Sequence, residues 1–193
     1  MTDLWTALEH HIHTVTGQPF VIRQRQPLGG GCINQAWRGS DGQRAFFFKL
    51  NAAATLPLFE AEAAGLAELA ATRTVRAPEP MGSGVAAGHA WLMLEYLPLM
   101  SGGTRAMEKL GHLLAALHAR PRKGFGWHRD NAIGATLQIN AYRDDWIEFW
   151  REQRLGFQLD LAARNGHAGA LQQQGEQLQI RLDGLFVGHS PTP

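Results

Sequence analysis

The stretch that decides the fold begins with Gly29-Gly30-Gly31-Cys32-Ile33-Asn34-Gln35-Ala36-Trp37, continues with Ala45-Phe46-Phe47-Phe48-Lys49-Leu50 and ends with Phe59-Glu60-Ala61-Glu62. These segments predict a glycine-rich turn between strands, an apolar strand that carries one lysine, and an alanine-rich helix that presents a glutamate. A turn without side chains lets backbone N–H groups approach phosphate oxygens. A lysine on the adjoining strand supplies positive charge, and a helix glutamate can hold that lysine in place. The pattern therefore predicts a phosphate-binding site.

The bulk composition is that of an ordinary globular chain. The 193 residues are 45% hydrophobic and 18% charged, with a formal net charge of +1. This balance gives no reason to expect a nucleic-acid or membrane surface. A single cysteine excludes an internal disulfide and suits a reducing compartment. Residues 1–15 have the pattern of an amphipathic helix rather than of a secretory signal, so we expect a cytoplasmic protein.

The first half of the chain alternates in character between helices and strands. A helix from Leu4 should end at Gly17, and a second helix should run from Pro57 to about Ala71. Five segments have the pattern of strands: residues 20–26, 32–38, 45–50, 81–85 and 90–96. The first three, joined by the glycine turn and by Ser40-Asp41-Gly42, predict an antiparallel meander. We therefore expect an α+β fold with a five-stranded antiparallel sheet.

The second half of the chain is expected to be helical, and the change of composition near Pro98 predicts two domains, residues 1–98 and 99–193. Apolar periodicity predicts helices over residues 104–119, 142–164 and from about 167 to 182, with a loop over residues 121–138. The aromatic stripe of Trp146, Phe149 and Trp150 is typical of helix-packing core. The last residues, 188–193, have the pattern of a connecting segment. Because such a segment leads to a further element, we expect a truncated chain.

Lys49 is the cation with the strongest functional signal. It lies inside an apolar strand, where an unpaired ammonium is expensive to bury. We expect Glu62 to be its partner, with Glu60 as the competing carboxylate, since the two glutamates lie on opposed faces of one helix. The alternative is an ordinary strand lysine that extends to the surface.

The end of the predicted fifth strand, Met93-Leu94-Glu95-Tyr96-Leu97, is the candidate adenine site. Its backbone groups could hold the edge of a base, with Met93 lining the pocket behind it. The alternative is a plain core strand followed by a linker, and periodicity alone favours that alternative.

Two smaller features allow a functional and a structural interpretation. Cys32 is either a buried structural thiol or an exposed thiol among amide dipoles, and in the second case we hypothesise that its oxidation blocks nucleotide binding. His10 and His13 have the spacing of metal ligands on one helix face, but a solvated polar face is the better interpretation.

Several further motifs carry a resemblance to a known family. They are Leu110 through Leu117-His118, Gly124-Phe125-Gly126-Trp127 with Asp130-Asn131-Ala132-Ile133-Gly134, and Asp145-Trp146-Ile147-Glu148-Phe149-Trp150-Arg151. Together with the glycine stretch, the Phe48-Lys49 strand and the Phe59 to Glu62 segment, they resemble the fructosamine kinase (ketosamine-3-kinase) family. That family is similar to aminoglycoside phosphotransferases and more distantly to protein kinases, which implies a two-lobed, protein-kinase-like fold with an incomplete helical C-lobe.

The resemblance implies ATP-dependent phosphorylation of the sugar 3-hydroxyl of small-molecule or protein-bound ketosamines, followed by release of the amine, which amounts to protein deglycation. It also implies a role for each matching residue. Lys49 would contact the phosphates and Glu62 would brace it, while Glu95 and Leu97 would supply hinge backbone contacts. The residues that would cover the phosphates are Gly29, Gly30, Gly31, Cys32, Ile33 and Asn34.

One part of the family pattern does not occur in these residues. The His-Gly-Asp catalytic segment is not found in the chain, and we expect it, with the Asn and Asp ligands of Mg²⁺, beyond Pro193. The chain alone should therefore be inactive and should expose apolar surface, with poor solubility or association, into a dimer for instance, as the result. Two alternatives stay open: another phosphotransferase acting on an aminoglycoside or a choline-type amino alcohol, and a non-catalytic nucleotide-binding pseudokinase.

Overall fold

A computed structural model describes residues 3–29 and 33–193. The chain divides into two compact units between Leu117 and His118. This division differs from the predicted boundary after residue 98 by the helix α3 (Thr104–His118), which falls almost entirely in the first unit. No residue of α3 is buried. The assignment of domains from the sequence thus stays a prediction.

The first unit contains a five-stranded sheet of β1 (Gln24–Leu28), β2 (Gln35–Ser40), β3 (Ala45–Ala52), β4 (Pro80–Ala86) and β5 (His89–Glu95). The strand order is β1-β2-β3-β5-β4, and every neighbouring pair is antiparallel. The predicted α+β class with a five-stranded antiparallel sheet is confirmed. The meander holds for β1 to β3, whereas β5 lies between β3 and β4.

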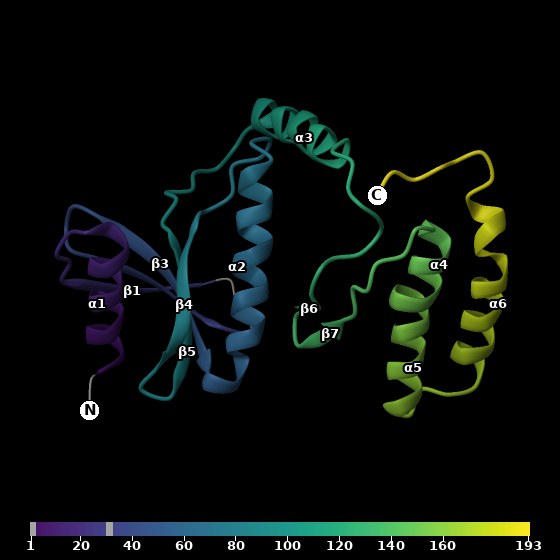
Figure 1. The fold of residues 1–193 in the computed structure, drawn as a ribbon, viewed down its shortest axis with the longest axis horizontal. Helices are drawn as coiled ribbons and strands as arrows, with labels where there is room; N and C mark the ends of the chain where they lie inside the picture. Colours follow the sequence, from purple (N-terminus) through teal and green to yellow (C-terminus); the bar gives the residue numbers. More distant parts are fainter. Residues whose placement is uncertain (1–2, 30–32) are drawn as a thin grey trace. The chain divides into compact units, whose positions relative to one another are not determined.

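Helices α1 (Leu4–Thr16) and α2 (Leu56–Ala71) cover opposite faces of the sheet (Figure 1). A short 3₁₀ turn, η1 (Ala53–Thr55), connects β3 to α2. The core under α1 contains Leu8 and Ile12 of the helix together with Phe46, Phe48 and Met93 of the sheet. The smaller core under α2 consists of Phe59, Ala90, Leu92 and Leu94. Strand side chains alternate between faces, so the central strands β3 and β5 contribute to both cores.

The first two strands begin later than the sequence predicts. Phe20 and Ile22 are buried in the core under α1, as their alternation indicates, yet the ladder with β2 starts at Gln24. The predicted strand over residues 20–26 is therefore wrong in its bounds. Alternation reports which side chains are buried, whereas the ladder depends on where the partner strand lies.

The hairpin between β2 and β3 turns at Asp41 and Gly42, as predicted. Asp41 Oδ1 accepts hydrogen bonds from the backbone N–H groups of Arg44 at 2.7 Å and Gln43 at 2.9 Å. Gly42 has φ 103°, a conformation that favours glycine. The Arg44 backbone N–H is the main cause that lowers the pKa of Asp41 from 3.8 to about 2; the Gln43 N–H and the Arg44 guanidinium lower it further, while burial opposes them.

A β-bulge in β4 brings α1 close to the backbone of the sheet. The register with β5 shifts between Pro80 and Gly82. The ring nitrogen Nε2 of His11 lies 2.9 Å from Met81 O, and the His11 ring packs against Trp91 at 4.7 Å. Gly82 has φ 145°, and a side chain there would overlap the His11 ring. Only glycine fits this contact without displacement.

The second unit contains three helices and a small hairpin. The helices are α4 (Trp146–Trp150), α5 (Phe157–Arg164) and α6 (Ala170–Leu185), with a π-helical segment, η2 (Arg151–Gly156), joining α4 to α5. The helix predicted from residue 142 begins at Trp146, because the Asp145 side chain caps it by accepting from Glu148 N. Strands β6 (Asn131–Ile133) and β7 (Thr136–Gln138) pair within residues predicted as a loop, so that prediction is wrong there.

Asn140 is the polar centre of the second unit. It is buried, and its backbone N–H donates to Asp130 Oδ1 while its carbonyl accepts from Trp127 N–H. Its side chain donates to Asn131 Oδ1 and accepts from Arg154 Nη2 at 2.7 Å. The Phe-Gly-Trp and Asp-Asn motifs of the sequence thus meet at one residue, through its backbone and its side chain.

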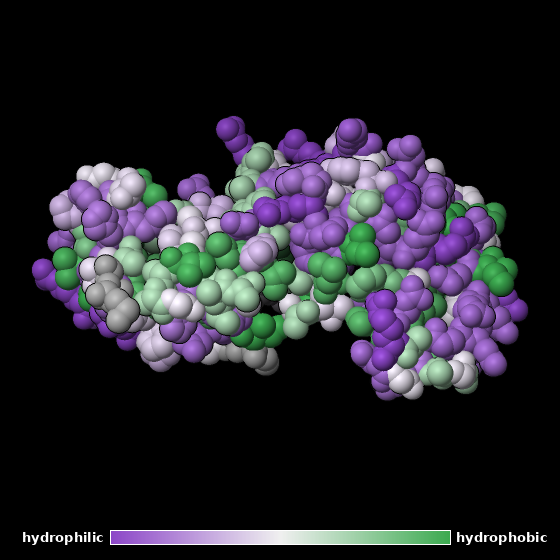
Figure 2. Space-filling model, turned by 60° about the horizontal axis from the view of Figure 1, so that its bottom comes forward, coloured by the Kyte–Doolittle hydropathy of each residue, from purple (hydrophilic) through white to green (hydrophobic). Residues whose placement is uncertain are grey.

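Apolar side chains also remain on the surface. Leu99 and Met100 are 88% and 92% exposed, and green patches interrupt the polar surface on the face drawn in Figure 2. Within the part of the chain that the structure describes, no helix is both long and apolar enough to cross a bilayer.

Candidate functional site

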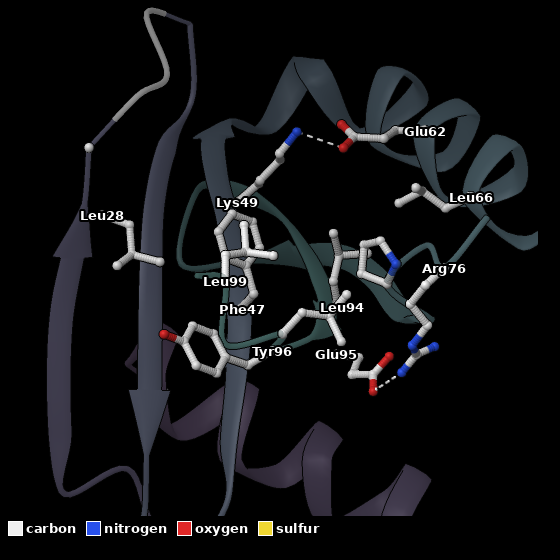
Figure 3. Close-up of a pocket in the computed structure, with 13 residues that line it drawn as sticks. Leu28, Phe47, Lys49, Glu62, Leu66, Arg76, Leu94, Glu95, Tyr96 and Leu99 are labelled. Carbon is white, nitrogen blue, oxygen red and sulfur yellow. Dashed lines mark hydrogen bonds and ion pairs between the residues drawn. The ribbon is translucent and has the colours of Figure 1, made fainter. Parts of the chain in front are cut away.

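A cavity of about 650 Å³ lies in the first unit, between the sheet and the residues that follow β5 (Figure 3). Leu28, Phe47, Leu66 and Leu94 give it apolar walls. Two charged pairs lie at its border, Lys49 with Glu62 and Arg76 with Glu95. An apolar slot with a few polar groups at its edge is the usual form of a small-molecule site.

Lys49 and Glu62 form the ion pair that the sequence predicts. Nζ of Lys49 donates to Glu62 Oε1 at 2.6 Å, and the two side chains are 27% and 33% exposed. Lys49 reaches the cavity because it shares a strand face with Phe47, while Phe46 and Phe48 face the core under α1. Glu60, the competing carboxylate, is exposed on α2. The catalytic roles of Lys49 and Glu62 remain predictions.

The second pair closes the other end of the cavity. Arg76 Nη2 donates to Glu95 Oε1, and the Glu95 backbone N–H donates to Glu79 O at 2.9 Å. The carboxylate of Glu95 is therefore held by Arg76. Tyr96 and Leu97 leave the sheet at this point and line the cavity. The predicted hinge contacts of Glu95 and Leu97 would involve their backbone groups.

Met93 does not line this cavity, which corrects the prediction made for it. It is fully buried in the core under α1, whereas its neighbours Leu92 and Leu94 face α2. The apolar run of the sequence gives no alternation from which the face of each residue could be read. The register with β3, which pairs Met93 with Phe48, decides it.

The predicted phosphate turn is described only in part. Gly29 lines the cavity beside Leu28, while Ile33 and Asn34 lie at the start of the return to β2 and are not part of the cavity lining. Gly30, Gly31 and Cys32 lie outside the described residues, so the hypothesis of a redox-sensitive Cys32 remains a hypothesis.

Asn51 is a residue that the sequence interpretation missed. Its Nδ2 donates to Asn34 Oδ1 at 2.6 Å and to Ile33 O at 3.2 Å, and its Oδ1 accepts from Ala52 N–H at 2.7 Å. Asn51 thus connects β3 to the residues that follow the glycine stretch. The signal in the sequence is its position two residues after Lys49, which places both on one face of the strand.

No metal centre is formed by the described residues alone: none of them belong to a group of three or more His, Cys, Asp and Glu that could hold an ion. His10 and His13 are both exposed on α1.

The Lys49–Glu62 pair indicates a protein-kinase-like class of protein before any comparison with known proteins. A lysine on the third strand paired with a glutamate on the following helix is how protein kinases hold ATP phosphates. A sequence profile of the fructosamine kinase family matches residues 4–193. The chain belongs to the fructosamine kinase family.

Individual relatives agree with this assignment. The chain is 46% identical over 161 residues to a protein of Synechocystis sp. named a probable ketoamine kinase, a match that covers 83% of this chain and 55% of the relative. It is 40% identical over 174 residues to the chloroplastic protein-ribulosamine 3-kinase of Arabidopsis thaliana, covering 88% and 53%. The chain thus spans about half the length of these curated relatives.

The fold is also found in a solved structure. A crystal structure of a Haemophilus somnus protein assigned as a fructosamine-3-kinase superposes with a TM-score of 0.86 at 25% sequence identity. The superposition covers 99% of this chain and 66% of that one.

Proposed function

We propose that this chain supplies the nucleotide-binding part of an ATP-dependent kinase that phosphorylates the sugar 3-hydroxyl of ketosamines. The observation that carries the proposal is the Lys49–Glu62 pair at the edge of an apolar cavity. Membership of the fructosamine kinase family and the names of two relatives, a ketoamine kinase and a protein-ribulosamine 3-kinase, support the substrate class. Protein deglycation and a cytoplasmic location belong to the same proposal.

The residues of the chain suit ATP in a definite orientation. The apolar walls around Phe47 and Leu94 would take the adenine, whose edge would meet backbone groups of Glu95 and Leu97. The Lys49 ammonium at the opposite end would contact the phosphates, and Glu62 would hold that ammonium in place. Mg²⁺ would neutralise phosphate charge when bound with the nucleotide, and we assign it no protein ligand among the described residues.

Residues 1–193 contain no His-Gly-Asp segment, which the family resemblance gives as the source of the catalytic base. We therefore propose that these residues alone bind nucleotide without transferring phosphate, since transfer also needs a positioned nucleophile. The second candidate, a binding module that performs no transfer, makes the same prediction for these residues alone.

Calorimetric titration of the chain with ATP and Mg²⁺ tests the proposal. We expect saturable binding that Lys49→Met weakens by about tenfold or more, because a charge-assisted contact to phosphate is lost. Lys109→Met, on the exposed helix α3, is the matched control and should bind like the unmodified chain. Unchanged affinity for ATP after Lys49→Met would contradict the proposed contact between Lys49 and the phosphates.

A second assay addresses the reaction. ADP release should not increase when a ribulosyl-lysine peptide is added to residues 1–193 with ATP, whereas a version extended to the length of the relatives should turn over. Turnover by residues 1–193 would overturn the binding-only proposal. An extended protein that binds ATP but phosphorylates no ketosamine would favour the binding module.

A further inference from the structure

The side chains of Asn51 and Asn34 form a short chain of hydrogen bonds beside the proposed phosphate site. Asn51 follows Lys49 by two positions on the same face of β3, which places it about 7 Å further along the strand. Asn34 comes three residues after Gly31 and directly before β2. The two amides are joined by the bond from Asn51 Nδ2 to Asn34 Oδ1 at 2.6 Å.

The direction of every bond in this chain is fixed by the backbone. Asn51 Oδ1 accepts from the backbone N–H of Ala52 at 2.7 Å, and a backbone N–H can only donate. The other end of the Asn51 amide must then be Nδ2, which donates to the carbonyl of Ile33 as well as to Asn34. A carbonyl can only accept, so both ends of the Asn51 amide have one allowed assignment.

The orientation of Asn34 follows from that of Asn51. Its Oδ1 is used as an acceptor, which leaves Nδ2 as the other end of the amide. Among the described residues, this NH₂ group has no hydrogen-bond partner. Asn34 therefore offers donors only, next to the glycine stretch and on the same side of the hairpin as Lys49.

We propose that Asn51 is a positioning residue that turns the Asn34 side chain so that its NH₂ group donates to a phosphate oxygen of the nucleotide. The proposal rests on the proposed function, since it requires phosphates near Lys49. Without Asn51, nothing would hold the Asn34 side chain in place or fix which end of its amide faces the phosphate, and an acceptor facing an anion is repelled, so the hydrogen bond to the phosphate would be lost. Asn51 fixes the orientation of the Asn34 amide before the ligand binds.

The test compares nucleotides that share the base but differ in phosphate. Asn51→Ala should weaken ATP binding about tenfold, the usual value of one hydrogen bond to a charged group, and should leave adenosine binding unchanged. Asn34→Ala should have the same two effects. Because Asn51 acts through Asn34, Asn51→Ala made in the Asn34→Ala background should cause no further loss.

The outcomes separate the inference from the proposed function. No ATP binding by the unmodified chain would refute the proposed function itself. ATP binding that survives Asn51→Ala, or losses that add in the double variant, would overturn the positioning role and leave the function standing. An equal loss of ATP and adenosine would also overturn it, because a general effect on the fold would then explain the result.

A second variant keeps the test decisive if Asn51→Ala lowers the stability of the fold. Asn51→Asp keeps the shape and the bond from Ala52 N–H, but it can only accept, so Asn34 would turn its NH₂ group inward. We expect ATP affinity to fall at least as far as in Asn51→Ala, with adenosine unaffected, and unchanged ATP affinity would again refute the proposal. Gln43→Ala, at the turn end of the same hairpin, is the matched control and should bind both ligands normally.

Discussion

Lys49 and Glu62 form a close pair that is still partly open to solvent. An ion pair of this exposure contributes on the order of 1 kcal/mol or less to folding. Glu62→Gln is therefore expected to lower the melting temperature by no more than about 4 °C. The same change should weaken ATP binding about tenfold, because Lys49 loses the group that orients it. Thermal melts with and without ATP measure both effects in one series.

Glu60→Gln is the control for this prediction, since Glu60 is on the same helix but exposed. It should leave the ATP-dependent rise in melting temperature unchanged. A loss of ATP binding in Glu60→Gln as large as in Glu62→Gln would show that net charge of α2, and not the pair, is what matters.

A substitution at Gly82 is expected to change the stability of the fold alone. Gly82→Ala combines a strained φ with an overlap against the His11 ring, so we expect the free energy of unfolding to fall by about 2–4 kcal/mol in urea denaturation. Gly88→Ala also has a positive φ, but a side chain there meets open space, so it should cost only about 1 kcal/mol. Equal losses in the two variants would exclude the contact with His11 as a cause.

At the scale of single residues, the sequence predicts the partner of a charged side chain better than the face of the sheet on which an apolar side chain lies. Lys49 and Glu62 could be paired in advance because a lysine in an apolar strand needs a partner. Met93 could not be assigned to a face, because its apolar neighbours carry no alternating signal. Asn51 was missed because its contacts depend on the return of the chain at Ile33 and Asn34, which only the hairpin register sets.

The β2–β3 hairpin should have a pH dependence that comes from Asp41. Hydrogen bonds from backbone N–H groups lower the pKa of its carboxyl from 3.8 to about 2 in the folded chain. The ionised form is therefore favoured by folding, and its contribution is complete above about pH 4 and is lost as the pH falls through 2. Asp41→Asn should be less stable than the unmodified chain at pH 5, and the difference should shrink toward pH 2.

Urea denaturation between pH 2 and 5, together with an NMR titration of the Asp41 carboxyl, checks this expectation. Gln43→Ala leaves both bonds to Asp41 in place and should follow the unmodified chain. A titration midpoint at or above 3.8 would contradict it.

Among the elements, those with one strong local signal were predicted well. Helices α1 and α2 and strands β3 to β5 lie within a few residues of their expected positions, because caps, prolines and apolar runs mark them. The β6–β7 pair was missed, since three-residue strands are too short to show alternation. The η2 segment has no sequence signal that separates it from an α-helix; its bonds to α6, such as that from Gln179 Nε2 to Arg151 O, are tertiary.

For the whole molecule, the exposed apolar surface should govern behaviour in solution. Met107 and Leu114 are 62% and 38% exposed on α3, which contains no buried residue. Changing both to Gln should reduce concentration-dependent light scattering without lowering the melting temperature, because no core contact is lost. Leu8→Gln, which places a polar group in the core under α1, is the contrasting variant and should unfold the first unit. A marked loss of stability in the α3 variant would show that its apolar side chains are packed.

The position of β5 between β3 and β4 has a consequence for folding kinetics. The central pair joins Phe46 to Glu95, so η1, α2 and β4 must all be closed into a loop before the middle of the sheet can form. The entropy of that closure precedes any gain from pairing, which slows folding relative to a sheet of sequential hairpins. During synthesis on the ribosome, β1 to β3 emerge before β5, so for an interval β3 has no partner on that side. Their aromatic strand is then an unpaired edge, and this interval is when the nascent chain is most exposed to aggregation.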